Sequence, residues 1–173
     1  MKNSGFDYLL AGLLLALALT FPLLFHAIGL GSAFLPMFFP IVAAGFLVRP
    51  RLALLVGGLA PLVSALLTGM PPFYPPIAFI MMAEGIVLTV VPHLFHQKLK
   101  LNVMVSLVLT LLLDRLVLLV LVLGIAGVMD LPKGVMGVAS VLRGLPGIGV
   151  MLVVIPPLVL AMKRRRNLSL IME

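Results

Sequence analysis

The sequence contains no cysteine and no tryptophan, and only 10% of its residues are charged. The absence of cysteine excludes disulfide bonds and thiolate metal sites. Hydrophobic residues, in contrast, make up 63% of the 173 positions. A soluble domain of this length cannot bury so large an apolar fraction. The composition therefore predicts a single integral membrane domain.

Several motifs that mark common active sites are also missing. The chain has no GxxxxGK[ST] motif, so it cannot hold the phosphates of ATP itself. It has neither HExxH nor GxSxG, the patterns of zinc peptidases and serine hydrolases. The glycine-rich GLPGIG lies in an apolar run, where glycine favours close helix packing or a kink rather than a nucleotide loop. We therefore expect a protein that is not an enzyme and has no cofactor.

Long apolar runs dominate what is present. A helix needs about 20 apolar residues to cross a bilayer. The runs predict an all-α integral membrane protein with six transmembrane helices, at about 6–27, 33–48, 52–68, 76–95, 101–129 and 139–162. The first run is longer than the apolar core of a signal peptide (about 7–15 residues), so we expect it to be retained.

The basic residues divide unequally between the two sides of such a bundle. One side carries Lys2, Arg49, Arg51, Lys98, Lys100 and residues 163–166, and the other carries Lys133. Because basic residues mark the cytoplasmic side, both termini are expected to be cytoplasmic. The net charge of +7 sits at the ends of apolar runs, so it does not indicate nucleic-acid binding.

Four charged residues are expected to be buried within the predicted helices: Glu84, Asp114, Arg115 and Arg143. Their formal charges sum to zero, which suits mutual compensation in an apolar interior. Asp114 and Arg115 point roughly 100° apart on a helix, so we expect that they do not pair with each other. Glu84 lies at a depth that the long side chain of Arg115 can reach, and we predict a Glu84–Arg115 ion pair.

The fifth run carries a polar face. Asn102, Ser106, Thr110 and Asp114 recur every four residues, which places them along one side of a helix. We expect this side to turn away from lipid. Hydrogen bonds between helices account for the first three residues without a functional role.

Glycine and proline gather in the loops expected outside the membrane, which read GLGS, GMPPFYPP and DLPKGVMGV. Such loops either form lids over a site or are plain connections. His26, at the outer end of the first run, lies at the level of these loops. Phe34 and Tyr74 supply aromatic groups there.

A long block of the chain reads FHAIGLGSAFLPMFFPIVAAGFLVRPRLALLVGGLAPLVSALLTGMPP, and a glutamate in the fourth run and a late RGLPGI follow it. Together these features resemble the substrate-binding S components of energy-coupling factor (ECF) transporters, over nearly the whole chain. The resemblance implies a multi-pass protein of a prokaryotic plasma membrane. It also implies capture of a vitamin or related micronutrient from outside, with uptake driven by a transmembrane T component and two cytoplasmic ATPases.

The resemblance further implies where the functional residues lie. Because the family's site lies near the outer surface, the expected substrate-binding residues are Glu84, Arg143, His26, Phe34, Tyr74 and Arg115. In this family a small-residue motif on the first helix meets the T component. Gly12 and Ala16 match its spacing, although Gly12 stands in place of an alanine. Packing of these two residues within the protein itself is the alternative. The lack of tryptophan disfavours a thiamine-like ligand.

Two other classes of function stay open. A proton-coupled carrier would use Glu84 and Asp114 as a relay and would be expected to contain inverted repeats. An intramembrane enzyme acting on lipid would need a clustered metal site or nucleophile, for which Asp114 alone is too little. Uptake that survives collapse of the proton gradient but stops without ATP would favour the ECF assignment.

Overall fold

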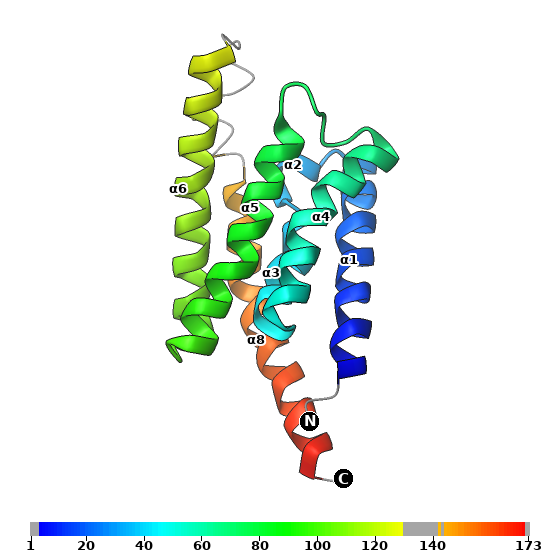
Figure 1. Ribbon diagram of the computed structural model, residues 1–173, viewed down its shortest axis with the longest axis vertical. Helices are drawn as coiled ribbons and strands as arrows, with labels where there is room; N and C mark the ends of the chain where they lie inside the picture. Colours follow the sequence, from blue (N-terminus) through cyan, green and yellow to red (C-terminus); the bar gives the residue numbers. More distant parts are fainter. Residues whose placement is uncertain (1–3, 130–141, 143, 172–173) are drawn as a thin grey trace.

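The computed structural model describes residues 4–129, 142 and 144–171, and every regular element in these ranges is helical. The elements are α1 (Ser4–Ala27), α2 (Gly31–Phe34), α3 (Phe38–Leu47), α4 (Pro50–Thr68), α5 (Ile77–Pro92), the π-helical η1 (His93–Lys98), α6 (Val103–Met129) and α8 (Leu145–Ile171) (Figure 1). Five helices are long and apolar enough to cross a membrane. The prediction of an all-α membrane protein is therefore confirmed.

Most of the predicted bounds agree with the helices. Those of the first, third and fifth runs differ from α1, α4 and α6 by at most two residues. The fourth run, at 76–95, covers α5 and the beginning of the π-helical η1. The start of the sixth, at 139–141, lies outside the described residues, and α8 continues past position 162 to Ile171. Lysine and arginine are good helix formers, which explains why α8 extends through its basic residues and projects beyond the other helices (Figure 1).

The second run, predicted as one helix over 33–48, is divided into α2 and α3. Leu35 ends α2 with a left-handed backbone (φ 51°, ψ 49°). Pro36 follows and has no N–H group with which to continue a helix. The 10 residues of α3 span about 15 Å, which is too short to cross a bilayer alone. We therefore correct the prediction of one continuous helix here.

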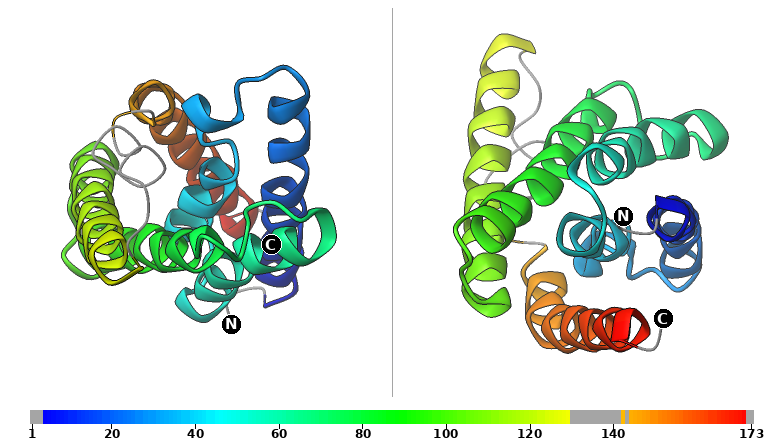
Figure 2. Two further views of the ribbon diagram at one scale, coloured as in Figure 1. Left: turned by 90° about the horizontal axis from the view of Figure 1, so that it is seen from above. Right: turned by 60° about the horizontal axis from the view of Figure 1, so that its bottom comes forward.

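The short helix α3 forms the centre of the bundle. It contacts α1, α4, α5 and α8 and lies between them (Figure 2). Its side chains Phe38, Ile41, Val42 and Phe46 are almost completely buried. The long helices instead expose many leucine and valine side chains on their outer faces, as expected where a protein meets lipid.

Glycines hold α5 close to its neighbours. A Cβ added to Gly57 of α4 would lie 2.2 Å from the carbonyl oxygen of Gly85, and one added to Gly85 would lie 2.1 Å from that of Gly57. A Cβ on Gly45 of α3 would lie 2.8 Å from the carbonyl oxygen of Leu88. Because these backbones approach so closely, the position of Glu84, beside Gly85, is fixed by the packing of α5 on α4 and α3.

The two ends of the bundle differ in charge. The beginning of α1, the junction of α3 with α4, the junction of η1 with α6 and the end of α8 lie at the same end (Figure 1). We call it the basic end, because these segments contain Arg49, Arg51, Lys98, Lys100 and Lys163. The opposite end carries α2 and the loop between α4 and α5 (Figure 1).

Candidate functional site

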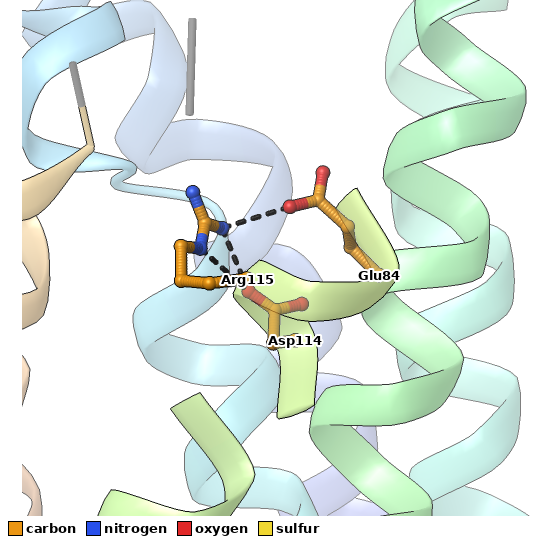
Figure 3. A network of polar contacts seen from close by, with 3 residues as sticks. All are labelled: Glu84, Asp114 and Arg115. Atoms are coloured by element: carbon orange, nitrogen blue, oxygen red, sulfur yellow. Dashed lines mark hydrogen bonds and ion pairs between the residues drawn. The ribbon is translucent and has the colours of Figure 1, made fainter. Parts of the chain in front are cut away.

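Three charged side chains meet between α5 and α6. Nη2 of Arg115 donates a hydrogen bond to Oε1 of Glu84 over 2.8 Å (Figure 3). This ion pair confirms the predicted partnership of Glu84 with Arg115. We call Glu84, Asp114 and Arg115 the buried triad.

The prediction that Asp114 and Arg115 do not pair was wrong. Nη2 and Nε of Arg115 donate to Oδ2 of Asp114 over 2.7 and 3.1 Å (Figure 3). The prediction compared only the directions in which the two side chains leave the helix. The arginine side chain is long enough to bend back over its own helix, so its guanidinium group bridges both carboxylates.

The triad is shielded from the surroundings of the bundle. The exposed fractions of its side chains are 14% for Arg115, 4% for Glu84 and 1% for Asp114. Such burial makes each charge costly unless it is paired and hydrogen-bonded. The two carboxylates are close neighbours because their oxygens accept hydrogen bonds from the same Nη2 atom.

Two groups on one side of the triad, a donor and an acceptor, have no hydrogen-bond partner within the described part of the chain. These are Nη1 of Arg115 and Oε2 of Glu84, which lie on the side of the triad away from Asp114 (Figure 3). Gly144 lies beside Nη1, since a Cβ added there would be 3.2 Å from this atom. The triad therefore presents a donor and an acceptor on the same side (Figure 3).

The glycines of RGLPGI allow the chain before and within α8 to approach α2. A Cβ on Gly144 would lie 2.7 Å from Cδ1 of Leu35, and one on Gly147 would lie 2.4 Å from the carbonyl oxygen of Phe34. These contacts confirm the expectation that this glycine-rich stretch serves close packing. They also place the segment around Leu35 next to Arg115.

The polar face of α6 is buried at three of its four predicted positions. Ser106, Thr110 and Asp114 are at most 1% exposed. Thr110 Oγ1 donates to the carbonyl oxygen of Ser106 over 2.6 Å. Asn102 is exposed, and its Oδ1 accepts a hydrogen bond from the backbone N–H of Val105 over 2.7 Å. It therefore caps the beginning of α6.

The remaining predicted site residues are not part of the triad. His26 is exposed and its Nδ1 lies 2.7 Å from the carbonyl oxygen of Pro22. Phe34 is partly buried, with its ring centroid 6.1 Å from that of Phe25. Tyr74 is 72% exposed. Arg143 lies outside the described residues. Among the described residues of the predicted set, Glu84 and Arg115 form an ion pair.

The loop between α4 and α5 has a defined shape. Ser64 Oγ and Thr68 Oγ1 donate to the carbonyl oxygen of Met70 over 2.7 and 3.1 Å. The backbone N–H of Ala78 donates to the carbonyl oxygen of Pro72 over 3.1 Å. These hydrogen bonds attach both ends of the loop to the helices that it joins. They hold it at the opposite end of the bundle.

One buried charged contact was missed by the sequence analysis. Nε of Arg49 donates to Oδ2 of Asp7 over 2.7 Å, and Asp7 is only 1% exposed. Asp7 lies near the start of the first apolar run, at the level predicted for Arg49, so matching depths would have found the pair. This ion pair joins α1 to the junction of α3 and α4 at the basic end.

Gly12 and Ala16 lie on the exposed face of α1. Both are exposed, and a Cβ added to Gly12 would have no atom within 4 Å. Their neighbours Ala11 and Ala18 are buried instead. Within the described residues, therefore, Gly12 and Ala16 do not serve close packing of α1 on the rest of the bundle.

The described residues contain no group of three or more histidine, aspartate or glutamate side chains that could hold a metal ion. Comparisons with protein-family models, curated proteins and solved structures gave no match to the chain.

Proposed function

We propose that the chain is the substrate-binding S component of an ECF-type transporter. In this role it binds a small polar micronutrient and passes it inward together with a T component and two ATPases. The observation that supports the proposal most directly is the buried triad. A membrane protein places ionisable groups in its interior at a cost, and such groups are commonly part of a substrate pathway.

The unpaired groups on the side of the triad away from Asp114 indicate what kind of ligand would fit. Nη1 of Arg115 can donate to a carbonyl or carboxylate oxygen, and Oε2 of Glu84 can accept from an N–H or O–H group. A ligand that carries both groups side by side would satisfy both atoms at once. We therefore propose a polar ring compound with a carbonyl or carboxylate next to a hydrogen-bond donor.

The six-span topology with cytoplasmic termini in a prokaryotic plasma membrane is part of this proposal. The beginning of α1 and the end of α8 lie at the same end of the bundle (Figure 1). This arrangement is consistent with an even number of crossings in which α2 and α3 together make the second. The basic residues at this end favour its placement in the cytoplasm.

The topology can be tested by cysteine labelling, because the chain has no cysteine of its own. We expect Leu99→Cys, an exposed position after η1, to react with a membrane-impermeant thiol reagent only after the cells are opened. Tyr74→Cys, at the opposite end, should react in intact cells. Labelling of position 99 in intact cells, with position 74 protected, would reverse the proposed orientation.

The T component is proposed to dock on α1 around Gly12 and Ala16. Exposed small residues four positions apart allow another helix to approach closely in a membrane. No described atom lies within 4 Å of a Cβ added to Gly12. We therefore expect a larger side chain there to leave the fold intact and to obstruct a partner helix.

This proposal predicts the effect of Gly12→Leu and Ala16→Leu on assembly. We expect either change to remove the T component and the ATPases from the affinity-purified protein, while the thermal stability of the isolated chain is unchanged. Gly124→Leu on α6 is the matched control, because Gly124 is also exposed and has no atom near its added Cβ. Proteomic mass spectrometry of the purified complexes gives the result. If the wild-type chain brings down no ATPase, the assignment to ECF transporters is wrong.

A further inference from the structure

The buried triad contains one negative charge more than it contains positive charges. Glu84 and Asp114 each carry a carboxylate when ionised, and Arg115 supplies a single guanidinium group. Both carboxylates accept a hydrogen bond from the same Nη2 atom of Arg115, so neither has a cation of its own. An uncompensated charge is strongly unfavourable at such a buried position.

One oxygen of the triad also lacks any hydrogen bond. Oδ1 of Asp114 is buried and has no partner, and it lies on the side of Asp114 that faces Glu84 (Figure 3). The nearest hydroxyl group along this face of α6 belongs to Thr110, and it donates to the backbone of Ser106 instead. A buried carboxylate oxygen without a donor is far less stable than the same oxygen in a neutral carboxylic acid.

The described neighbours of the triad supply no further cation at its depth. α3, which packs on α5, has no titratable residue. The titratable or charged residues of the other elements packed on α5 and α6 all lie towards the basic end: Arg51, His93, His96, Lys98 and residues 163–166. Arg143, which precedes α8, lies outside the described residues.

We propose that the buried triad binds one exchangeable proton, which Glu84 and Asp114 share, so that the triad as a whole is neutral. The proton comes from water and forms an O–H bond with one of the two carboxylates, while the other stays ionised beside Arg115. A ligand that donates a hydrogen bond to Oε2 favours the ionised form of Glu84, and the proton then resides on Asp114. This inference concerns the charge of the triad and is independent of the assignment to ECF transporters.

Infrared spectroscopy of the purified protein at neutral pH provides the first test. We expect the C=O stretching band of a protonated carboxylic acid in the wild-type protein. The band should be lost in Glu84→Gln and equally in Asp114→Asn, because each variant leaves one carboxylate opposite one guanidinium group. Asp7→Asn is the matched control: it removes a carboxylate that is paired with Arg49, and should keep the band.

The pH dependence of stability provides a second test. Unfolded carboxyl groups lose their protons near pH 4. Above that pH the folded wild-type protein holds one proton more than the unfolded chain. The unfolding equilibrium constant should therefore rise with pH, by up to tenfold per pH unit. Glu84→Gln and Asp114→Asn should each remove this pH dependence. The double variant Glu84→Gln/Asp114→Asn should raise the unfolding equilibrium constant about a hundredfold or more at neutral pH, because it leaves Arg115 without a counter-ion.

Two results would overturn the proposal without any variant needing to fold. One is a wild-type spectrum without the carboxylic acid band, which would mean that a cation such as Arg143 compensates the triad. The other is a wild-type stability that does not change between pH 5 and 9. A band that persists in Glu84→Gln would also overturn it, because the proton would then belong to one acid alone.

Discussion

Alanine in place of Gly85 is expected to lower the free energy of unfolding by about 3 kcal/mol, which is at the upper end of overpacking costs. The added Cβ would lie 2.1 Å from the carbonyl oxygen of Gly57. That oxygen belongs to the backbone of α4 and cannot move away as the end of a flexible side chain can. The two helices must separate, and Glu84 would move with α5. Gly57→Ala should have an effect of the same size, because its Cβ would meet Gly85 in the same way.

Gly58→Ala is the matched control for this prediction. It lies next to Gly57 on α4, and its added Cβ would be 3.9 Å from Ile86, an ordinary contact. Alanine is the better helix former by up to about 1 kcal/mol, so this variant should be as stable as the wild-type protein or more stable. Thermal unfolding of the three variants in detergent checks the prediction. Equal effects at positions 57 and 58 would show that the close crossing of α4 and α5 is absent.

Arg115→Met is expected to lower the free energy of unfolding by about 3–5 kcal/mol. The change removes the one guanidinium group that donates hydrogen bonds to both Glu84 and Asp114. Two buried carboxyl groups then lose their donors and their counter-ion together. Arg51→Met is the matched control, because Arg51 is exposed at the basic end and its replacement should change stability by no more than about 0.5 kcal/mol.

Adding Glu84→Gln to Arg115→Met should recover part of the loss, and adding Asp114→Asn as well should recover more. The recovery follows because each change removes a carboxylate that has lost its cation. Denaturant unfolding of the single, double and triple variants measures the coupling. Strictly additive losses for Glu84 and Arg115 would mean that the two side chains do not interact in the folded protein.

The triad shows which parts of a buried site can be predicted from sequence. The depths of Glu84 and Arg115 follow from counting residues along apolar runs, and their pairing was predicted correctly. The contact between Asp114 and Arg115 was not predicted, because it depends on the conformation of the flexible arginine side chain. Asp7 and Arg49 could have been paired by the same argument of depth, but the acidic residue near the start of the first run was not considered.

The packing of the bundle was less accessible to prediction. The apolar run over 33–48 has no polar residue to mark its interruption at Leu35, and its proline at position 36 resembles those that helices tolerate in membranes. Likewise, the sequence shows where Gly57 and Gly85 lack a side chain but not that they meet each other. A contact between two helices depends on both segments, so the residue pattern of one segment alone does not predict it.

The central position of α3 has a consequence for biogenesis. The segment with α2, the interruption at Leu35 and α3 offers lipid an irregular backbone, which is stable in a membrane only when protein surrounds it. Three of the helices that enclose it, α4, α5 and α8, are synthesised later. A nascent chain that ends before α5 therefore cannot leave this segment in the bilayer in its final form. We therefore expect this segment to reach its final form only together with the later helices, so that the order of assembly differs from the order of synthesis.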